Sequence, residues 1–394
     1  MDRRSVLKGI AGVSLGLSGV ECMGAAADGK ISEATDKFGR MIIAEQESTG
    51  MELDKSIVKV TQFGATGDGQ TDDTAAIKKA MAALPEKGGV LFFPPGTYAT
   101  DTIKPPSFCT LLAHGAWGYR LVGGVVLTPV HDHQPCLIDA TGCVGTRLVG
   151  LTLDGKKRGK DMCGVFVKRG DSEQNVVVDD CRIEHFSGSG LVMDIAHVWA
   201  VRHSIIDANG LDGIDAHRGF DAWIIDNQIT ANGRYGVNLL ASTTVTGNRI
   251  EHNKKAGIHL YGRKQDGIQV TGNLFCTNHG PAIDSPGEHR CATVTGNSFR
   301  FNGAVPISDD PAHNCHVRFR KTYGLVMTGN SFNAVDRYPS IGLTLEGLVD
   351  SVVANNTLFQ GATRELIRDI GGHVNTVIEN NPGSIVSPER PAVS

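Results

Sequence analysis

The middle of the chain carries acidic, basic and aromatic side chains at nearly regular intervals. A first series is spaced by 23, 21 and 25 residues and consists of Asp215, Asn238, His259 and Asp284. Further ionisable residues lie two to four positions from this series. The residues that we expect to carry the chemistry are Asp215, His217, Arg234, His259, Tyr261 and Lys255.

This mixture of side chains suits the removal of a proton next to a carboxylate group, as at C5 of a uronate sugar. A cation must neutralise the sugar carboxylate, and we assign this role to Arg234 and Lys255. A base removes the C5 proton, and an acid then protonates either the leaving oxygen or the opposite face of C5. His217, His259 and Tyr261 are the acid and base candidates, and Asp215 would orient a histidine or support charge. The first outcome is lyase cleavage and the second is epimerisation.

A second group of polar residues is expected to contact the substrate. This group consists of Asp194, Asp212, Tyr235, Asn238 and Asp284. We predict no protein metal site, although the aspartates could hold Ca²⁺, which prefers several oxygen ligands. His131 and His133 are interpreted as surface residues, because a lone H-x-H pair lacks further ligands.

A repeat of 21 to 33 residues must position these side chains. Each unit contains an apolar residue, two variable residues, a small or polar residue, one variable residue and a second apolar residue, as in Val245–Ile250 and Val270–Phe275. Ile214, Val237, Ile258 and Ile283 precede the polar series directly and should stack inside, because neighbouring side chains of a strand point to opposite faces. The repeat therefore predicts an all-β, single-stranded parallel β-helix, a solenoid whose coils cover one another.

Two columns of small or polar residues, mostly asparagine, accompany the repeat. The first runs through Cys181, Ser204, Asn227, Asn248, Asn273, Asn297, Asn330 and Asn356, and the second through Asn209, Asn232, Asn253, Asn278 and Asn302. We interpret both as structural. Asparagine tolerates left-handed turn geometry, and stacked asparagine side chains can hydrogen-bond to one another.

The ends of the chain indicate export and capping. Residues 1–27 contain Arg3-Arg4, a short apolar stretch and three alanines, as in a twin-arginine-like export signal or a general secretory signal. Residues 28–56 form a helical or linker segment, 57–382 the β-helix and 383–394 a tail. A helix from Thr74 to Leu84 would cap the N-terminal end. We therefore expect a periplasmic or secreted protein, in which some cysteines could pair.

The composition of the chain indicates which kinds of partner it can bind. A net charge of −4 gives no basic footprint for nucleic acid, and no later apolar stretch reaches the length of a membrane span. A polysaccharide is the expected partner, and the polymer, the metal dependence and the oligomeric state stay open.

The N-terminal motifs resemble the pectate-lyase-like superfamily. FGATGDGQTDDTAAI begins at Phe63, and FFPPGTY follows and ends at Tyr98. This resemblance implies a right-handed parallel β-helix over about 57–382 and carbohydrate chemistry.

A shorter stretch, Asp212 to His217, is similar to the Y-G-F-D-P-H motif of alginate (mannuronan) C5-epimerases. Asp215 and His217 fall on the family Asp and His. The family Tyr is replaced by Asp212, and its Arg corresponds to Lys255, with Arg234 one coil earlier.

Two alternatives remain. Asn209 to Asp215 is similar to the N-T-D-G motif of polygalacturonase-type hydrolases, but the next coil lacks their paired aspartates. A non-catalytic glycan-binding protein is the second alternative, and it would expose aromatic platforms.

Overall fold

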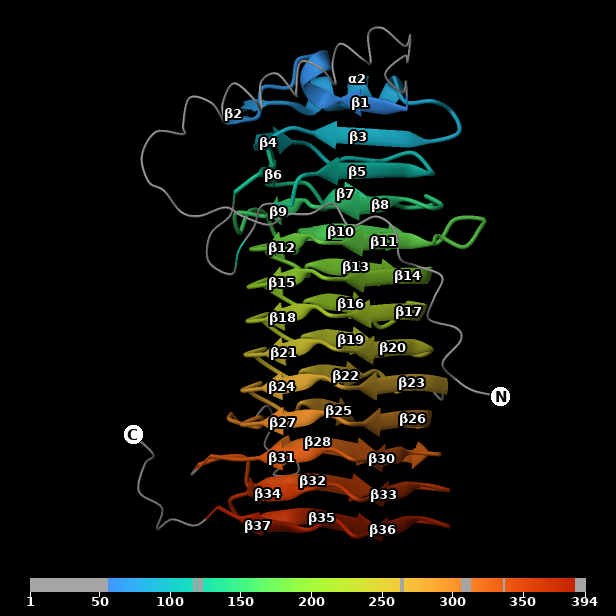
Figure 1. Cartoon of the computed structure of the whole chain (residues 1–394), viewed down its shortest axis with the longest axis vertical. Helices are drawn as coiled ribbons and strands as arrows, with labels where there is room; N and C mark the ends of the chain where they lie inside the picture. The colour runs from blue at the N-terminus through green and yellow to red at the C-terminus, as the bar shows by residue number, and fades with distance from the viewer. Residues whose placement is uncertain are drawn as a thin grey trace, which may run out of the picture. The chain divides into compact units, whose positions relative to one another are not determined.

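The computed structural model describes residues 56–386, apart from 116–117, 119–122, 263–265, 306–312 and 336. The expected export signal, nearly all of the 28–56 segment and the end of the tail lie outside the described residues. Strands of successive coils pair in parallel and stack along one axis, so the fold is an all-β parallel solenoid, as expected (Figure 1).

Three long sheets, here called A, B and C, run along this axis. Sheet A contains β1 (Ile57–Lys59), β3 (Gly89–Phe93), β5 (Cys109–Ala113), β8 (Arg147–Val149), β11 (Val176–Asp179), β14 (His197–Arg202), β17 (Phe220–Ile225), β20 (Thr243–Thr246), β23 (Asp266–Thr271), β26 (His289–Thr295), β29 (Thr322–Tyr323), β30 (Val326–Thr328), β33 (Val352–Ala354) and β36 (Val377–Glu379). Sheet B contains β2 (Asp68–Asp72), β4 (Gly96–Thr100), β6 (Val125–Pro129), β9 (Thr152–Asp154), β12 (Arg182–Glu184), β15 (Ile205–Asp207), β18 (Gln228–Thr230), β21 (Arg249–Glu251), β24 (Leu274–Cys276), β27 (Ser298–Arg300) and β31 (Ser331–Asn333). Sheet C contains β7 (Cys136–Asp139), β10 (Cys163–Lys168), β13 (Leu191–Asp194), β16 (Ile214–Ala216), β19 (Val237–Leu239), β22 (Ile258–Leu260), β25 (Ile283–Ser285), β28 (Cys315–Arg320), β32 (Ile341–Glu346) and β35 (Glu365–Gly371). A separate pair consists of β34 (Leu358–Ala362) and β37 (Gly383–Ile385).

The core is a set of aliphatic and aromatic stacks inside the coils. Ile214 pairs with Val237, Val237 with Ile258 and Ile258 with Ile283, and all four are fully buried. This confirms the expected register. Each coil covers the apolar face of the next, which an isolated coil could not bury.

The asparagine columns are internal ladders, as expected. Asn253, for example, donates through Nδ2 to Asn278 Oδ1 at 2.9 Å and accepts from Asn232 Nδ2 at 3.0 Å. The left-handed backbone, however, belongs to the residue before each asparagine rather than to the asparagine. Ala231 and His252 have φ values of 54° and 56° and precede Asn232 and Asn253. The asparagines therefore serve the turn through their side-chain hydrogen bonds.

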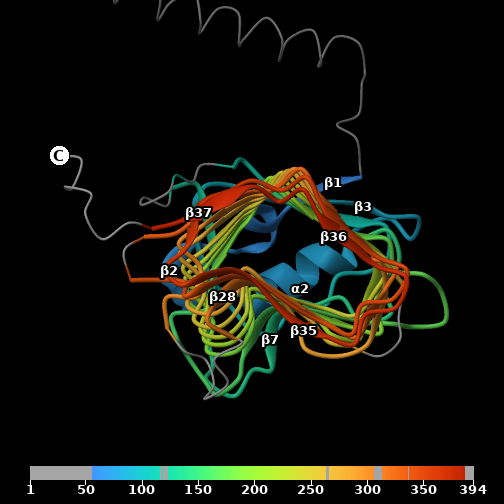
Figure 2. The same ribbon diagram turned by 90° about the horizontal axis from the view of Figure 1, so that it is seen from below.

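Both ends of the solenoid are defined. At the N-terminal end a 3-10 helix, η1 (Val60–Phe63), precedes the helix α2 (Thr74–Ala82). Ala76, Ile77 and Ala80 of α2 join the apolar core, so this helix caps the first coils (Figure 2). It ends two residues before the expected Leu84. At the other end, β37 lies just beyond the expected boundary at residue 382.

No helix in the described part of the chain is long and apolar enough to cross a membrane. The eight cysteines of the described residues form no disulfide with one another.

Candidate functional site

The outward column of sheet C brings the predicted polar series together. Asp215 pairs in register with Asn238, Asn238 with His259, and His259 with Asp284. Strands β16, β19, β22 and β25 therefore place four functional positions on consecutive coils, about 4.8 Å apart. The repeat alone predicted this alignment correctly.

Asp215 and His217 form a hydrogen-bonded pair at one end of this column. His217 Nδ1 lies 2.7 Å from Asp215 Oδ1, and the same oxygen accepts a bond of 3.1 Å from Asn238 Nδ2. The carboxylate favours a proton on Nδ1 and so leaves Nε2 of a neutral His217 able to accept one. The His217 side chain is 36% exposed, so a substrate can reach it. This arrangement is that of an oriented general base.

Arg234 lies beside this pair and is held by a buried carboxylate. Its Nε donates to Asp212 Oδ1 at 2.7 Å, and its Nη2 donates to Asp212 Oδ2. The pKa of Arg234 is raised by its hydrogen bond to Asp212, so it remains a cation. Nη2 also lies 3.7 Å from Asp215 Oδ2, and a third of the side chain is exposed. Only two of the five N–H donors of Arg234 are committed to Asp212. The other donors of this fixed, partly exposed guanidinium can therefore bind a substrate carboxylate.

Asp212 does not contact the substrate as expected, but supports a neighbouring residue. It is fully buried, and besides Arg234 it accepts the backbone N–H of Tyr235 at 3.0 Å. We therefore assign it to positioning Arg234. In this chain Asp212, at the place of the family Tyr, supports a cation.

A second cluster lies further along the column. Asp284 is 3% exposed, and it accepts a bond of 2.7 Å from Arg318 Nε and lies 3.5 Å from His259 Nδ1. Burial opposes the charge on Asp284, but the adjacent His259 ring and the charge of Arg318 outweigh it, and the pKa of Asp284 is lowered. Asp284 therefore positions His259 rather than contacting a substrate directly.

Aromatic rings connect the two clusters. The Tyr235 ring stacks on His259, with 4.4 Å between ring centroids and an interplanar angle of 5°. Tyr261, 37% exposed, lies 5.3 Å from the His217 ring. The pKa of Tyr235 is raised by burial and by Asp284, so Tyr235 holds its proton firmly.

Of the remaining expected residues, Lys255 is exposed, Asp194 is partly exposed and Asn238 is buried. Lys255 Nζ is 5.8 Å from the centroid of the Tyr235 ring. Asp194 forms an ion pair of 2.9 Å with Arg218 and lies 4.0 Å from Lys168 Nζ. Asn238 is 4% exposed and serves mainly to hold Asp215.

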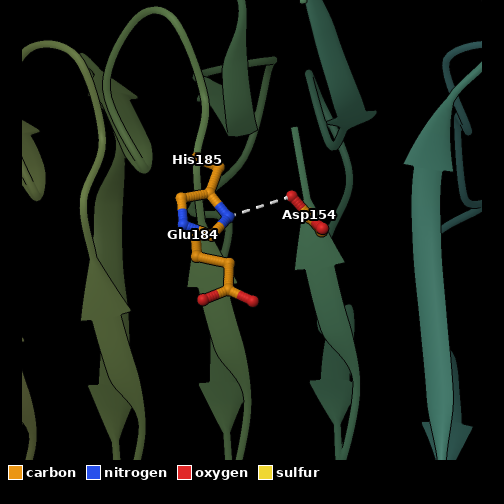
Figure 3. A group of neighbouring side chains, drawn as sticks. All are labelled: Asp154, Glu184 and His185. Atoms are coloured by element: carbon orange, nitrogen blue, oxygen red, sulfur yellow. Dashed lines mark hydrogen bonds and ion pairs between the residues drawn. The ribbon is translucent and has the colours of Figure 1, made fainter. Parts of the chain in front are cut away.

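The described residues include one cluster with the composition of a metal site, and it lies on sheet B (Figure 3). The candidate ligand atoms of Asp154, Glu184 and His185 lie within 4.8 Å of one another. Lys156 Nζ already contacts Asp154 at 2.9 Å, and Arg182 Nε contacts Glu184 at 2.7 Å. These cations balance the carboxylates. Ca²⁺ binding stays a prediction.

Arg318 is a site residue that the sequence reasoning missed. It pairs in register with Asp284, but the coil between them contains the longest interval of the repeat, 33 residues between Asn297 and Asn330. Because this insertion lengthens the coil, counting residues from the turn no longer leads to the equivalent position on the next strand. Extending the apolar column from Ile283 to Val317 would have found it.

Comparisons with known proteins agree with this architecture. The family model "Right handed beta helix region" matches residues 157–275 and 241–383, and "Rhamnogalacturonase A/epimerase, pectate lyase-like" matches residues 57–120. A mannuronan C5-epimerase of Azotobacter vinelandii is 29% identical over 47% of this chain and 36% of its own length. An alginate lyase of the same organism is 28% identical over 47% of this chain and 23% of its own length.

Solved structures show the same fold. The A-module of another Azotobacter vinelandii mannuronan C5-epimerase superposes with a TM-score of 0.65 at 16% identity, covering 84% of this chain and all of that one. The chain spans about a third or less of the length of the two curated relatives. Because the β-helix model matches more than half of the sequence, the chain belongs to the right-handed β-helix family, as a pectate-lyase-like member with a resemblance to mannuronan C5-epimerases.

Proposed function

We propose that this protein acts on a uronate-containing polysaccharide by removing the proton at C5, as a lyase or a C5-epimerase. The observation that carries the proposal is the pairing of an oriented base with a fixed cation. His217 is held by Asp215 at 2.7 Å, and Arg234 lies 3.7 Å from the same carboxylate. Relatives that act on mannuronan and alginate support a carbohydrate substrate.

The Arg234 guanidinium would bind the sugar carboxylate and stabilise the negative charge that develops on it when C5 is deprotonated. His217 Nε2 would take the C5 proton, and Asp215 would stabilise the imidazolium that forms. Lys255, which is exposed, can add positive charge. In this arrangement the base and the cation act on the same sugar unit.

The second half of the reaction needs a proton donor. In a lyase the C4–O4 bond breaks, the electron pair left at C5 forms the C4–C5 double bond, and a proton goes to the leaving oxygen. In an epimerase no bond to oxygen breaks, and a proton is added to the opposite face of C5. Tyr261, beside His217, and His259, which stacks on Tyr235, are the donor candidates.

A glycoside hydrolase fits this site less well. Such an enzyme needs two carboxyl groups facing the scissile bond, one of them protonated. Asp212 and Asp284 are buried and bound to arginines, and the pKa of Asp284 is lowered. Burial raises the pKa of Asp212, but its carboxylate is enclosed and accepts hydrogen bonds from Arg234 and from the backbone of Tyr235. Neither can serve as an exposed acid, so proton abstraction is the better use of these residues.

The proposal includes export, because a polymer of this kind lies outside the cytoplasm. The two arginines and the short apolar stretch of residues 1–27 support it.

Replacing His217 or Arg234 by alanine tests the proposal. We expect a loss of about 10² to 10⁴-fold in turnover on the identified polymer, with the circular dichroism spectrum unchanged, because acid/base groups contribute on this scale. His203→Ala is the matched control, because His203 forms a comparable pair with Asp179 at 2.9 Å, away from sheet C. Unsaturated ends identify a lyase, inverted C5 without cleavage an epimerase, and saturated reducing ends a hydrolase. Full activity of both folded variants would contradict the proposal.

A further inference from the structure

A groove of about 360 Å³ leads from the candidate site toward the N-terminal end of sheet C. Part of its lining is the outward column that contains Asp215. Asp139, Phe166, Val192 and Asp215 pair in register on β7, β10, β13 and β16. Three strand intervals of about 4.8 Å make this stretch roughly 14 Å long, enough for a short oligosaccharide. A polymer that reaches His217 along sheet C would therefore continue into this groove.

The lining of this groove is apolar and acidic. Pro135, Phe166, Val192 and Leu211 supply apolar surface. Asp139, Asp161 and Asp215 supply carboxylates, and none of the described residues that line the groove is a lysine, arginine or histidine. Phe166 is partly exposed, so its ring offers a stacking surface.

The cations of the candidate site lie on the other side of Asp215. Arg234, Lys255 and Arg318 belong to the coils that follow it. Lys168 of β10 is on the groove side, but it lies 4.0 Å from Asp194 and does not line the groove. The charge of the side chains that a substrate would meet therefore differs on the two sides of Asp215. On the Arg234 side, a substrate carboxylate meets guanidinium groups, whereas on the groove side it would meet carboxylates of like charge.

We infer that the groove binds a neutral sugar unit with an apolar face, and that the substrate is therefore a heteropolysaccharide in which uronate units are interrupted by neutral ones. This inference rests on the proposed function, which assigns the uronate to Arg234 and His217. The C–H face of a pyranose, or a methyl or acetyl substituent on it, packs on Phe166 and the aliphatic residues beside it. A homopolymer of uronates would place a second carboxylate against Asp161 and near Asp139, whose charge is offset by the 73% exposed Lys104.

A second cavity lies next to the groove. This cavity, of about 410 Å³, shares Pro135 and Asp139 with the groove and adds Lys78 and Lys104. Lys104 Nζ lies 3.6 Å from Asp139, and its side chain is 73% exposed. Lysine side chains thus lie at the far end of the groove, each beside a carboxylate, because Lys78 Nζ lies 3.9 Å from Asp101 of the same cavity.

Binding of defined tetrasaccharides to the His217→Ala variant, measured by isothermal titration calorimetry, tests this inference without turnover. The probes are galacturonate alternating with rhamnose, glucuronate alternating with N-acetylglucosamine, and the homopolymers of galacturonate and mannuronate. We expect at least one alternating probe to bind about tenfold more tightly than both homopolymers, a difference of about 1.4 kcal/mol.

Two groove variants assign the effect to the groove. Phe166→Ala should weaken the alternating probe about tenfold, whereas Phe359→Ala, which removes a 56% exposed phenylalanine of β34, should not. The double variant Asp139→Asn and Asp161→Asn should bring the homopolymers closer to the alternating probe. Asparagine suits position 161, where φ is 55°.

The outcomes separate this inference from the proposed function. Equal binding of all probes, together with no effect of Phe166→Ala, would overturn the groove assignment, even where His217→Ala abolishes activity. Conversely, full activity of His217→Ala would overturn the proposed chemistry, and the probe preference would then still report on the groove.

Discussion

Replacing His316 by leucine should remove part of the acid sensitivity of the fold. His316 lies in β28 and is fully buried, with its ring 5.7 Å from that of Phe332. Neither ring nitrogen has a hydrogen-bond partner among the described residues. Burial lowers the pKa of His316 from 6.5 to about 3, because the interior cannot solvate the imidazolium.

The sign and size of the effect follow from this shift. The unfolded chain binds a proton here at a higher pH than the folded chain does, so stability falls as the pH decreases below 6.5. With 1.36 kcal/mol per pKa unit, the loss is about 2 kcal/mol at about pH 5 and about 3 kcal/mol at about pH 4. It levels off below the folded pKa of about 3. Leucine has a similar volume and no titrating group, so this loss should disappear.

Urea unfolding at about pH 7.5 and about pH 5 measures the effect. The free energy of unfolding of His316→Leu relative to the wild type should increase by about 2 kcal/mol between these two conditions. The buried His289, whose pKa is lowered to about 4, remains in both proteins and cancels. His133→Leu is the control, because His133 is exposed. Parallel pH profiles of wild type and His316→Leu would refute the reasoning.

Three further predictions concern the site, the ladder and the N-terminus. Asp212→Asn should lower kcat by up to about 10²-fold and also raise KM, because the Arg234 guanidinium that binds the sugar carboxylate loses its fixed position. Asp212→Glu should restore part of the activity, and equal kcat in all three proteins would exclude a positioning role. Asn253→Ala removes four side-chain hydrogen bonds and should lower the free energy of unfolding by about 2 to 5 kcal/mol, as read from urea unfolding, and a change below 1 kcal/mol would mean that water replaces the ladder. N-terminal sequencing of exported material should find a mature chain beginning near Asp28, and an uncleaved cytoplasmic product would contradict the export signal.

The sequence by itself determined the solenoid and the register of its columns. Residues at the same place in each repeat must lie on the same face, because side chains alternate along a strand and coils stack in parallel. The repeat alone places Ile214 inside and aligns Asp215 with Asn238 and His259, as the structure has them. The N-terminal motifs likewise pointed to the pectate-lyase-like group, whose family model matches residues 57–120.

Only the tertiary structure decided which of these side chains reach a substrate and which support their neighbours. Repeat spacing assigns a face but not the depth of burial or the direction of a long side chain. Asp212 and Arg234 are 22 residues apart, and their pairing depends on how the turn of one coil packs on the next. The insertion before β28 hid Arg318, because periodicity no longer counts across it. Solvation and ion pairing, on which acid/base chemistry depends, arise from contacts between coils that no single repeat contains.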